Sequence, residues 1–310
     1  MIELENVTKK YGDFTAIDNM SFKINKGEIV GFLGKNGAGK TTTLKMITGL
    51  IGQTEGSILI NGEKINNKSK KLIGFMPENT PLYQDMTVKE YINYIGELKK
   101  IKKDKRKEDV KKIINSLGLL DVENKLIKNI SRGYKQRVSM AGALIGNPEI
   151  IILDEPTVGL DPTQIVEIRN LIKSLKGKHT VLFSSHILSE VNQICEKVII
   201  IDKGKLIVQD TLENIEEKIN KNVIIIDIED SDNNIEKIKQ DIKEIQSIKF
   251  VKEKDRKIKE YEIYVDKDCD IRKKLFNILP KYSISIIELK TSETSLEEAF
   301  LELTDRQEEK

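Results

Sequence analysis

The sequence predicts two domains: an α/β domain with a largely parallel sheet, and a smaller α+β domain of ferredoxin-like topology. The chain has 310 residues, enough for about two domains of ordinary size. Up to about residue 210, short apolar runs typical of buried strands alternate with amphipathic helical segments. From about residue 222 onward there is no glycine, and the predicted elements follow the order βαββαβ.

In the first region, each element follows from a local pattern. Glu28–Leu33 is an apolar run that ends in glycine, as expected of a buried strand, and Lys40–Thr48 follows as a helix. Ser57–Ile60 leads into Asn61-Gly62, which is typical of a hairpin turn. Asp109–Leu117 has its apolar residues at helical spacing. Further predicted strands are Ile150–Leu153, Thr180–Ser184, Val198–Ile201 and Lys205–Val208, and further predicted helices are Ile187–Cys195 and Leu212–Ile219.

The second region predicts a split βαβ pattern. Its predicted strands are Val223–Ile228, Ile248–Lys252, Tyr261–Val265 and Ile284–Leu289, and its predicted helices are Asn233–Glu244 and Ile271–Leu279. A last amphipathic segment is expected over Ser295–Leu303. We therefore expect domains at residues 1–215 and 222–310.

Charge and cysteine content exclude several classes of protein. The 52 Lys and Arg residues nearly balance the 50 Asp and Glu residues, so a formal charge of +2 gives no field that would favour nucleic acid. Two distant cysteines, Cys195 and Cys269, exclude a disulfide framework and fit a reducing compartment, with Cys195 interpreted as a small core residue. The apolar stretches are far shorter than the roughly 20 residues of a spanning helix, and Met1–Glu5 alternates like a strand rather than a signal peptide. We expect a cytoplasmic protein.

A phosphate-binding loop is predicted between the first buried strand and its helix. Residues 34–41 fit G-x-x-x-x-G-K-[ST] at every fixed position. Glycines let successive backbone N–H groups face one anion, and the N-terminus of the following helix adds its positive end. Lys40 is expected to reach the β- and γ-phosphates, and the Thr41 hydroxyl to bind Mg²⁺. The residues expected to bind nucleotide in this segment are Gly34, Asn36, Gly37, Ala38, Gly39, Lys40, Thr41 and Thr42.

Two adjacent carboxylates follow the strand Ile150–Leu153. Open α/β sheets bind ligands at the carboxyl ends of their strands, where Asp154 and Glu155 fall. Asp154 is placed to hold Mg²⁺ through water, and Glu155 to activate the attacking water as a general base. The alternative interpretation is a pair of exposed acids at the end of a strand.

The order of these motifs resembles that of the ABC-type ATPases, the nucleotide-binding subunits of ABC transporters. The resemblance covers about residues 2–210. Besides the phosphate loop, the matching segments are KKYGDFTAID with Tyr11, IGFMPENTPLY at the Q-loop position, ISRGYKQRV at the signature, IIILDEPTVGLDP at the Walker B and D-loop positions, and SSHILSEV with His186.

The resemblance implies a P-loop NTPase core with a helical subdomain at about residues 79–135, acting on ATP with Mg²⁺. Tyr11 would stack on adenine, although it also fits an amphipathic residue at a strand end. His186 would contact the γ-phosphate and orient the water held by Glu155. Ser131 and Gly133 would touch the γ-phosphate bound to a second copy in a head-to-tail homodimer, and Asp161 would cross the same interface.

The sequence departs from the family pattern at two motifs. Arg132 and Tyr134 replace a glycine and the glutamine of the signature, and Glu78 replaces the usual Q-loop glutamine. A carboxylate at Glu78 can still approach Mg²⁺. Both changes resemble the branch that serves drug and antimicrobial-peptide exporters with a separate permease chain.

We therefore expect an ATP-hydrolysing subunit, peripheral on the inner face of the cell membrane, that drives export through a separate integral membrane permease. The segment 79–129, with an apolar spot at Pro81, Leu82 and Tyr83, would dock a permease helix. The alternative is a soluble ABC ATPase acting on nucleic acid or ribosomes, which the charge balance does not favour. The basic run between Lys99 and Lys107 is either a solvated face or a site for an anionic partner. The C-terminal domain is interpreted as regulatory or dimer-stabilising.

Overall fold

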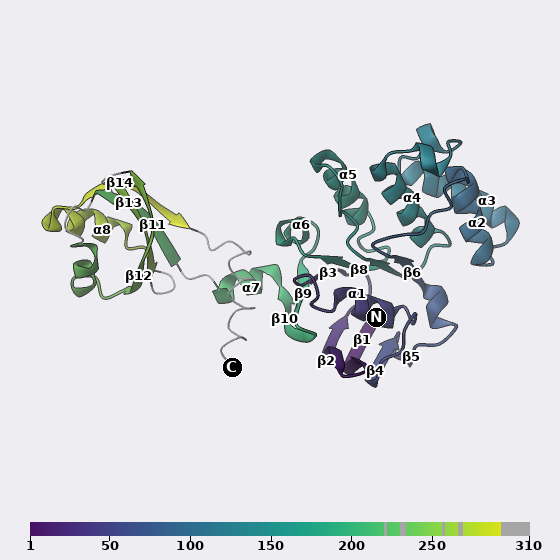
Figure 1. The fold of residues 1–310 in the computed structure, drawn as a ribbon, viewed down its shortest axis with the longest axis horizontal. Coiled ribbons are helices and arrows are strands. Elements are labelled where there is room, and N and C mark those ends of the chain that lie inside the picture. The colour runs from purple at the N-terminus through teal and green to yellow at the C-terminus, as the bar shows by residue number, and fades with distance from the viewer. Residues whose placement is uncertain (220–221, 230–233, 256–257, 266–268, 293–310) are drawn as a thin grey trace. The chain divides into compact units, whose positions relative to one another are not determined.

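The chain divides into two units, Met1–Leu212 and Glu213–Lys310, and each has its own hydrophobic core (Figure 1). The computed structural model describes residues 1–219, 222–229, 234–255, 258–265 and 269–292. The division falls at the start of helix α7 (Leu212–Ile219), close to the domain limits expected from the sequence.

The first unit is built on a six-stranded sheet with strand order β10-β9-β3-β8-β7-β6. Five strands are parallel and the edge strand β10 is antiparallel to β9, which confirms the prediction of a largely parallel sheet. Every residue of β3, β7 and β8 is buried, as expected of parallel strands covered on both faces. The strands are β3 (Ile29–Leu33), β6 (Ile73–Met76), β7 (Ile150–Leu153), β8 (Thr180–Ser185), β9 (Lys197–Asp202) and β10 (Lys205–Thr211).

A second, antiparallel sheet shares a core with the first. Its order is β2-β1-β4-β5, and its apolar side chains pack with residues of the six-stranded sheet and of helix α1 (Lys40–Ile47) in one cluster. The predicted hairpin at Asn61-Gly62 is confirmed, with both residues at positive φ. The strands are β1 (Ile2–Tyr11), β2 (Phe14–Ile24), β4 (Glu55–Ile60) and β5 (Glu63–Lys64).

Three helices, α2 (Val88–Leu98), α3 (Lys103–Ser116) and α4 (Arg132–Leu144), pack together beside the β6 edge of the sheet (Figure 1). Thr87 and Glu90 form a capping box at the start of α2. The helix predicted to start at Asp109 begins earlier, at Lys103, because an exposed Lys-rich turn before Asp109 continues the helix. The short 3₁₀ segments of this unit are η1 (Ser69–Leu72), η2 (Leu120–Val122) and η3 (Ile127–Asn129).

Two helices connect the later strands of the large sheet, α5 (Pro162–Lys173) and α6 (Leu188–Asn192). The predicted helix Ile187–Cys195 was too long, because the helix ends at Asn192 and a turn leads into β9. Cys195 is nevertheless a core residue, as expected. Burial raises the pKa of its thiol to about 12, so this cysteine stays protonated and unreactive.

The second unit has the strand order β12-β13-β11-β14 with every neighbouring pair antiparallel, which is the ferredoxin-like arrangement predicted from the βαββαβ order. Its elements are β11 (Asn222–Glu229), η4 (Asn234–Gln240), β12 (Ile245–Asp255), β13 (Ile258–Val265), α8 (Arg272–Ile278), η5 (Leu279–Tyr282) and β14 (Ser285–Ser292).

The first helix predicted in this unit, Asn233–Glu244, was wrong in type and length. The structure has a 3₁₀ helix that ends at Gln240. Ile235 and Ile238 are three residues apart and both buried, and three residues make one 3₁₀ turn, so this geometry places both side chains toward the core. Residue 233 and the predicted segment Ser295–Leu303 lie outside the described residues.

The close packing of β6 against α4 gives a test of the fold. A Cβ atom on Gly74 would lie 2.2 Å from the backbone oxygen of Ala143, so Gly74→Ala must push strand and helix apart. We predict a loss of about 1–3 kcal/mol in the free energy of unfolding of the first unit. Urea denaturation measures this loss. Hydrogen exchange of the β6 amides shows that the transition belongs to the first unit.

Gly52→Ala is the matched control, because a Cβ there would meet no atom within 4 Å. Equal stabilities of the two variants would show that strand and helix are not in close contact at Gly74.

Candidate functional site

The loop between β3 and α1 has the backbone conformation of an anion cradle. Gly39, directly before α1, has φ +102°, a conformation that residues other than glycine rarely adopt. A Cβ on Gly34 would lie 2.8 Å from the backbone oxygen of Ile201, so the loop also needs glycine for close approach. The first N–H groups of a helix have no partner within the helix and point out of its N-terminus. The loop therefore presents donors and a positive dipole end to one point.

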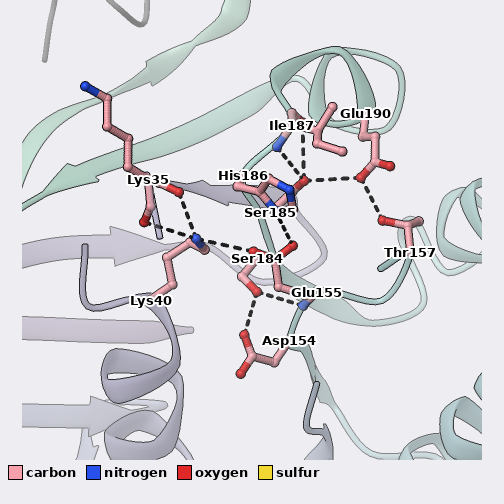
Figure 2. A network of polar contacts seen from close by, with 11 residues as sticks. Lys35, Lys40, Asp154, Glu155, Thr157, Ser184, Ser185, His186, Ile187 and Glu190 are labelled. Atoms are coloured by element: carbon pink, nitrogen blue, oxygen red, sulfur yellow. Dashed lines mark hydrogen bonds and ion pairs between the residues drawn. The ribbon is translucent and has the colours of Figure 1, made fainter. Parts of the chain in front are cut away.

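Lys40 points back into this loop from the first turn of α1 (Figure 2). Its Nζ donates to the backbone oxygen of Gly34 at 2.8 Å and to that of Lys35 at 3.4 Å. The same Nζ lies 3.3 Å from Oε1 of Glu155, and both side chains are less than a tenth exposed. A buried cation is thus matched by one buried carboxylate.

The two acids that follow β7 are buried together with Ser184 of β8. The Ser184 hydroxyl donates to Oδ1 of Asp154 at 2.7 Å and accepts from the backbone N–H of Glu155 at 2.8 Å. Glu155 itself has φ +49°, an uncommon conformation for a residue with a side chain. The alternative of two exposed acids is excluded, since Asp154 and Glu155 are 1% and 7% exposed.

His186 lies beside Glu155 although it comes from the neighbouring strand. Its Nδ1 is 2.9 Å from Oε2 of Glu155, so the imidazole donates to the carboxylate. Glu155 is thereby held from one side by Lys40 and from the other by His186 (Figure 2).

These groups open onto one cavity of about 380 Å³. The predicted site residues on its wall are Asn36, Gly37, Gly39, Lys40, Thr41, Thr42, Glu78, Glu155 and His186. Four other residues predicted for this site do not line the cavity: Gly34, Ala38, Asp154 and Tyr11. Of these, Ala38 and Asp154 are buried. The cavity is also lined by Phe14, Ala16 and Val158, which sequence reasoning did not assign.

Two aromatic rings stand at the end of the β1–β2 hairpin, where Tyr11 pairs with Phe14. Tyr11 is half-exposed, and the Nζ of Lys9 lies 4.9 Å from the centre of its ring. Phe14 is 67% exposed and lines the cavity. In the sequence, the signal for Phe14 was that it is a second aromatic residue, three positions after Tyr11.

Ser131, Gly133 and Asp161 do not reach this cavity. They line a separate hollow of about 410 Å³. Ser131 caps α4 by accepting from the N–H of Tyr134, and Asp161 caps α5 by accepting from the N–H of Gln164 at 2.9 Å. A single chain therefore does not bring the two groups of predicted nucleotide contacts together.

The two unusual signature residues make contacts within the chain. Arg132, the first residue of α4, donates from Nη2 to the backbone oxygen of Val158 at 3.1 Å. The guanidinium of Arg137 lies over the ring of Tyr134, 5.5 Å from its centre. Tyr134 lines the hollow beside Gly133, whereas Arg132 does not.

The donor set fits a hard divalent cation that is shared with phosphate oxygens. Oδ2 of Asp154 is buried and has no hydrogen-bond partner among the described residues, while Ser184 holds Oδ1. The wall of the cavity adds the Thr41 hydroxyl and the Glu78 carboxylate. No group of three or more His, Cys, Asp or Glu side chains among the described residues could hold a metal ion alone. Oxygen ligands from a phosphate would complete such a site.

The fold and the cavity define a nucleotide-binding protein with a phosphate-binding loop. Residues 17–158 match the sequence family described as ABC transporter. The bacitracin transport ATP-binding protein BcrA of Bacillus licheniformis is 33% identical over 98% of this chain and 97% of its own length. The linearmycin resistance ATP-binding protein LnrL of Bacillus subtilis (strain 168) is 32% identical over 99% of both chains.

Among solved structures, the dimeric ABC transporter cassette MJ0796 has a TM-score of 0.62 at 30% identity, covering 68% of this chain and 99% of that one. A post-hydrolysis state of the same cassette, bound to ADP and Pi, also has a TM-score of 0.62 at 29% identity, with the same coverage. The chain belongs to the family of ABC transporter ATP-binding proteins, and it is an ATPase of that family.

The two aromatic rings of the hairpin give a test of the site. We predict that Phe14→Ala weakens ATP binding by about fivefold or more, since stacking of a base on an aromatic ring is worth about 1–3 kcal/mol. Tyr11→Ala should have the smaller effect, because Phe14 and not Tyr11 lines the cavity. Isothermal titration calorimetry with ATP measures both affinities.

Inorganic tripolyphosphate is the control ligand, because it lacks a base and should bind equally to both variants. A larger loss with Tyr11→Ala than with Phe14→Ala would assign the stacking to Tyr11.

Proposed function

We propose that this chain binds and hydrolyses ATP to drive export through a separate membrane permease. One observation carries the chemistry: Lys40, Glu155 and His186 meet in a single cavity beside the phosphate-binding loop. The direction of transport is supported by relatives named for bacitracin transport and linearmycin resistance.

ATP binding would rearrange the charges in the cavity. Lys40 would exchange Glu155 for the β- and γ-phosphate oxygens, which carry more negative charge. Glu155, freed from Lys40 and still hydrogen-bonded to His186, would take a proton from the attacking water. His186 would orient that water and contact the γ-phosphate. Gly37, Gly39 and their neighbours in the loop would hold the phosphates by backbone N–H groups.

Mg²⁺ would bind between the nucleotide and the strand ends. The Thr41 hydroxyl would ligate it directly, Asp154 would hold it through water, and Glu78 stands on the wall nearby. When bound, the ion neutralises charge on the phosphate oxygens. Ser184 keeps Asp154 oriented for this task through its hydrogen bond to Oδ1.

Two copies would be needed for a complete site. The hollow with Ser131, Gly133 and Asp161 shares no residue with the cavity around Lys40, so we propose that a second copy supplies it. The N-terminus of α4 would then point its free N–H groups at the γ-phosphate held by the partner. Closing such a pair on ATP and opening it after hydrolysis would provide the mechanical step. The dimeric cassette MJ0796 supports this arrangement.

The permease would dock on the groove between α2 and α3. Val110, Ile114 and Leu120 give this groove of about 470 Å³ an apolar lining, with Lys107 and Lys111 beside them. An amphipathic cytoplasmic helix with an apolar stripe and acidic flanks matches this surface in polarity and charge.

No helix among the described residues is long and apolar enough to cross a membrane. We propose that the chain is held at the inner face of the cell membrane by its permease. An action on nucleic acid is not favoured, because the net charge is +2 and the relatives described above are named for transport or resistance. We assign the C-terminal unit a regulatory or dimer-stabilising role.

The proposed chemistry is tested at Glu155. Glu155→Gln removes the base but leaves the phosphate loop in place, so ATP should bind and turnover should be lost. A dimer should then accumulate with ATP and Mg²⁺, because hydrolysis no longer opens it. Size-exclusion chromatography with light scattering measures the dimer, and phosphate release measures turnover.

Lys40→Ala is the companion variant, and it should lose tight ATP binding and form no such dimer. Glu63→Gln, on β5, controls for the loss of one carboxylate. Undiminished phosphate release by Glu155→Gln would contradict the assigned role, and a chain that stays monomeric with ATP would contradict the pairing.

The docking groove is tested with Leu120→Asp. Leu120 is 58% exposed, so the substitution should not disturb folding, but an acidic charge there should repel an acidic helix. We predict loss of co-purification with the proposed permease, while the ATPase activity of the isolated subunit is unchanged.

Leu50→Asp is the control, because Leu50 is similarly exposed, at 63%, and does not line the groove. Retention of the membrane partner by Leu120→Asp would place the docking surface elsewhere.

A further inference from the structure

Glu190 is a buried carboxylate that the proposed chemistry does not use. It lies in α6 and is only 5% exposed. Its Oε2 accepts from the Thr157 hydroxyl at 2.7 Å and from the Ser185 hydroxyl at 3.2 Å (Figure 2). Burying a charge is unfavourable unless hydrogen bonds compensate, so a purely apolar packing role would not require a carboxylate here.

The two hydroxyls belong to the segments that carry the catalytic groups. Thr157 is two residues after Glu155. The turn that contains it is closed by the backbone N–H of Val158, which donates to the backbone oxygen of Glu155 at 3.2 Å. Ser185 directly precedes His186. Glu190 therefore joins the turn behind the carboxylate to the loop that holds the imidazole.

Ser185 extends this connection across His186. Its hydroxyl oxygen accepts from the backbone N–H of Ile187 at 3.0 Å. One hydroxyl thus joins the residues on both sides of His186, and its oxygen lies within hydrogen-bond distance of Glu190 at 3.2 Å and of the backbone oxygen of Ile187 at 3.3 Å (Figure 2). Thr157 and Ser185 are 6% and 1% exposed, so water does not compete freely for these bonds.

We propose that Glu190 is a positioning residue, which acts through Thr157 and Ser185 to hold Glu155 and His186 at hydrogen-bond distance during ATP hydrolysis. This inference rests on the proposed function, in which these two groups orient and activate water. Because neither group touches Glu190 directly, its removal should disturb catalysis without disturbing the phosphate loop.

The first experiment compares Glu190→Leu with Glu190→Gln. Leucine cannot accept from either hydroxyl, whereas the amide oxygen of glutamine can accept from both. For Glu190→Leu, kcat for ATP should fall by about tenfold or more with KM unchanged, because a misplacement of about 1 Å can cost about 100-fold in rate. Glu190→Gln should retain most of the activity.

Two substitutions of Thr157 test the same network while the Glu190 carboxylate is kept. Thr157→Val removes the hydroxyl at constant shape, and Thr157→Ser keeps it. We expect Thr157→Val to lower kcat and Thr157→Ser to preserve it. In the double variant, the losses in kcat from Glu190→Leu and Thr157→Val should not add, because both substitutions break the same interaction. For the same reason, Glu190→Leu should lower kcat little further in a chain that already carries His186→Ala.

A readout independent of turnover separates this inference from the proposed function. The imidazole ¹⁵N shifts of His186 report its bond to Glu155 in the nucleotide-free chain, and His179, the other of the two histidines, is the internal reference. Glu190→Leu should shift His186 alone, and Glu190→Gln should leave both histidines unchanged.

Wild-type kcat in folded Glu190→Leu and Thr157→Val would overturn the inference. So would a failure of glutamine to rescue leucine, or a rise in KM that matches the loss in kcat, since each indicates a structural effect only. If the wild-type chain does not hydrolyse ATP, the proposed function fails, and the His186 shifts still decide whether Glu190 holds the imidazole in place.

Discussion

The ion pair between Lys40 and Glu155 is the interaction on which the cavity depends. The two charges lie 3.3 Å apart with side chains 7% and 9% exposed, and either charge alone would be costly at that depth. Without nucleotide each therefore satisfies the other. Entry of a triphosphate would, in the proposed function, offer Lys40 stronger partners and leave Glu155 bonded to His186 alone. In the proposed function, binding itself thus prepares the base, and Glu155 has little freedom to act before a phosphate has displaced it from Lys40.

The sheet explains how residues far apart in sequence reach this pair. Strands β3, β7 and β8 are parallel neighbours in register, with Leu33 opposite Ser185 and Leu153 opposite Phe183. Their carboxyl ends consequently lie at one edge. The phosphate loop, the two acids and His186 each follow one of these strands, so a topology of buried apolar runs is sufficient to assemble the site.

This is also why much of the site could be predicted from sequence. A buried strand followed by glycines, or by Asp154 and Glu155, fixes the position of a side chain by local pattern alone. The contacts of Ser184 with Asp154 and Glu155 depend instead on a neighbouring strand, for which one sequence has no local signal. The same limit applies to η4, because Ile235 and Ile238, three residues apart, would share one face in an α-helix as well.

The separate hollow around Ser131 and Asp161 gives the buried network a further consequence. Asp161 lies at the end of the segment that starts at Glu155, and Thr157 in its middle is bonded to Glu190. A partner's nucleotide that drew on Asp161 would act on a segment already tied to the loop of His186. Movement at the interface between two copies would then reach base and imidazole together rather than one at a time. In the proposed pair, a shared anchor of this kind would favour an all-or-none site, in which cleavage would wait for closure of the two copies.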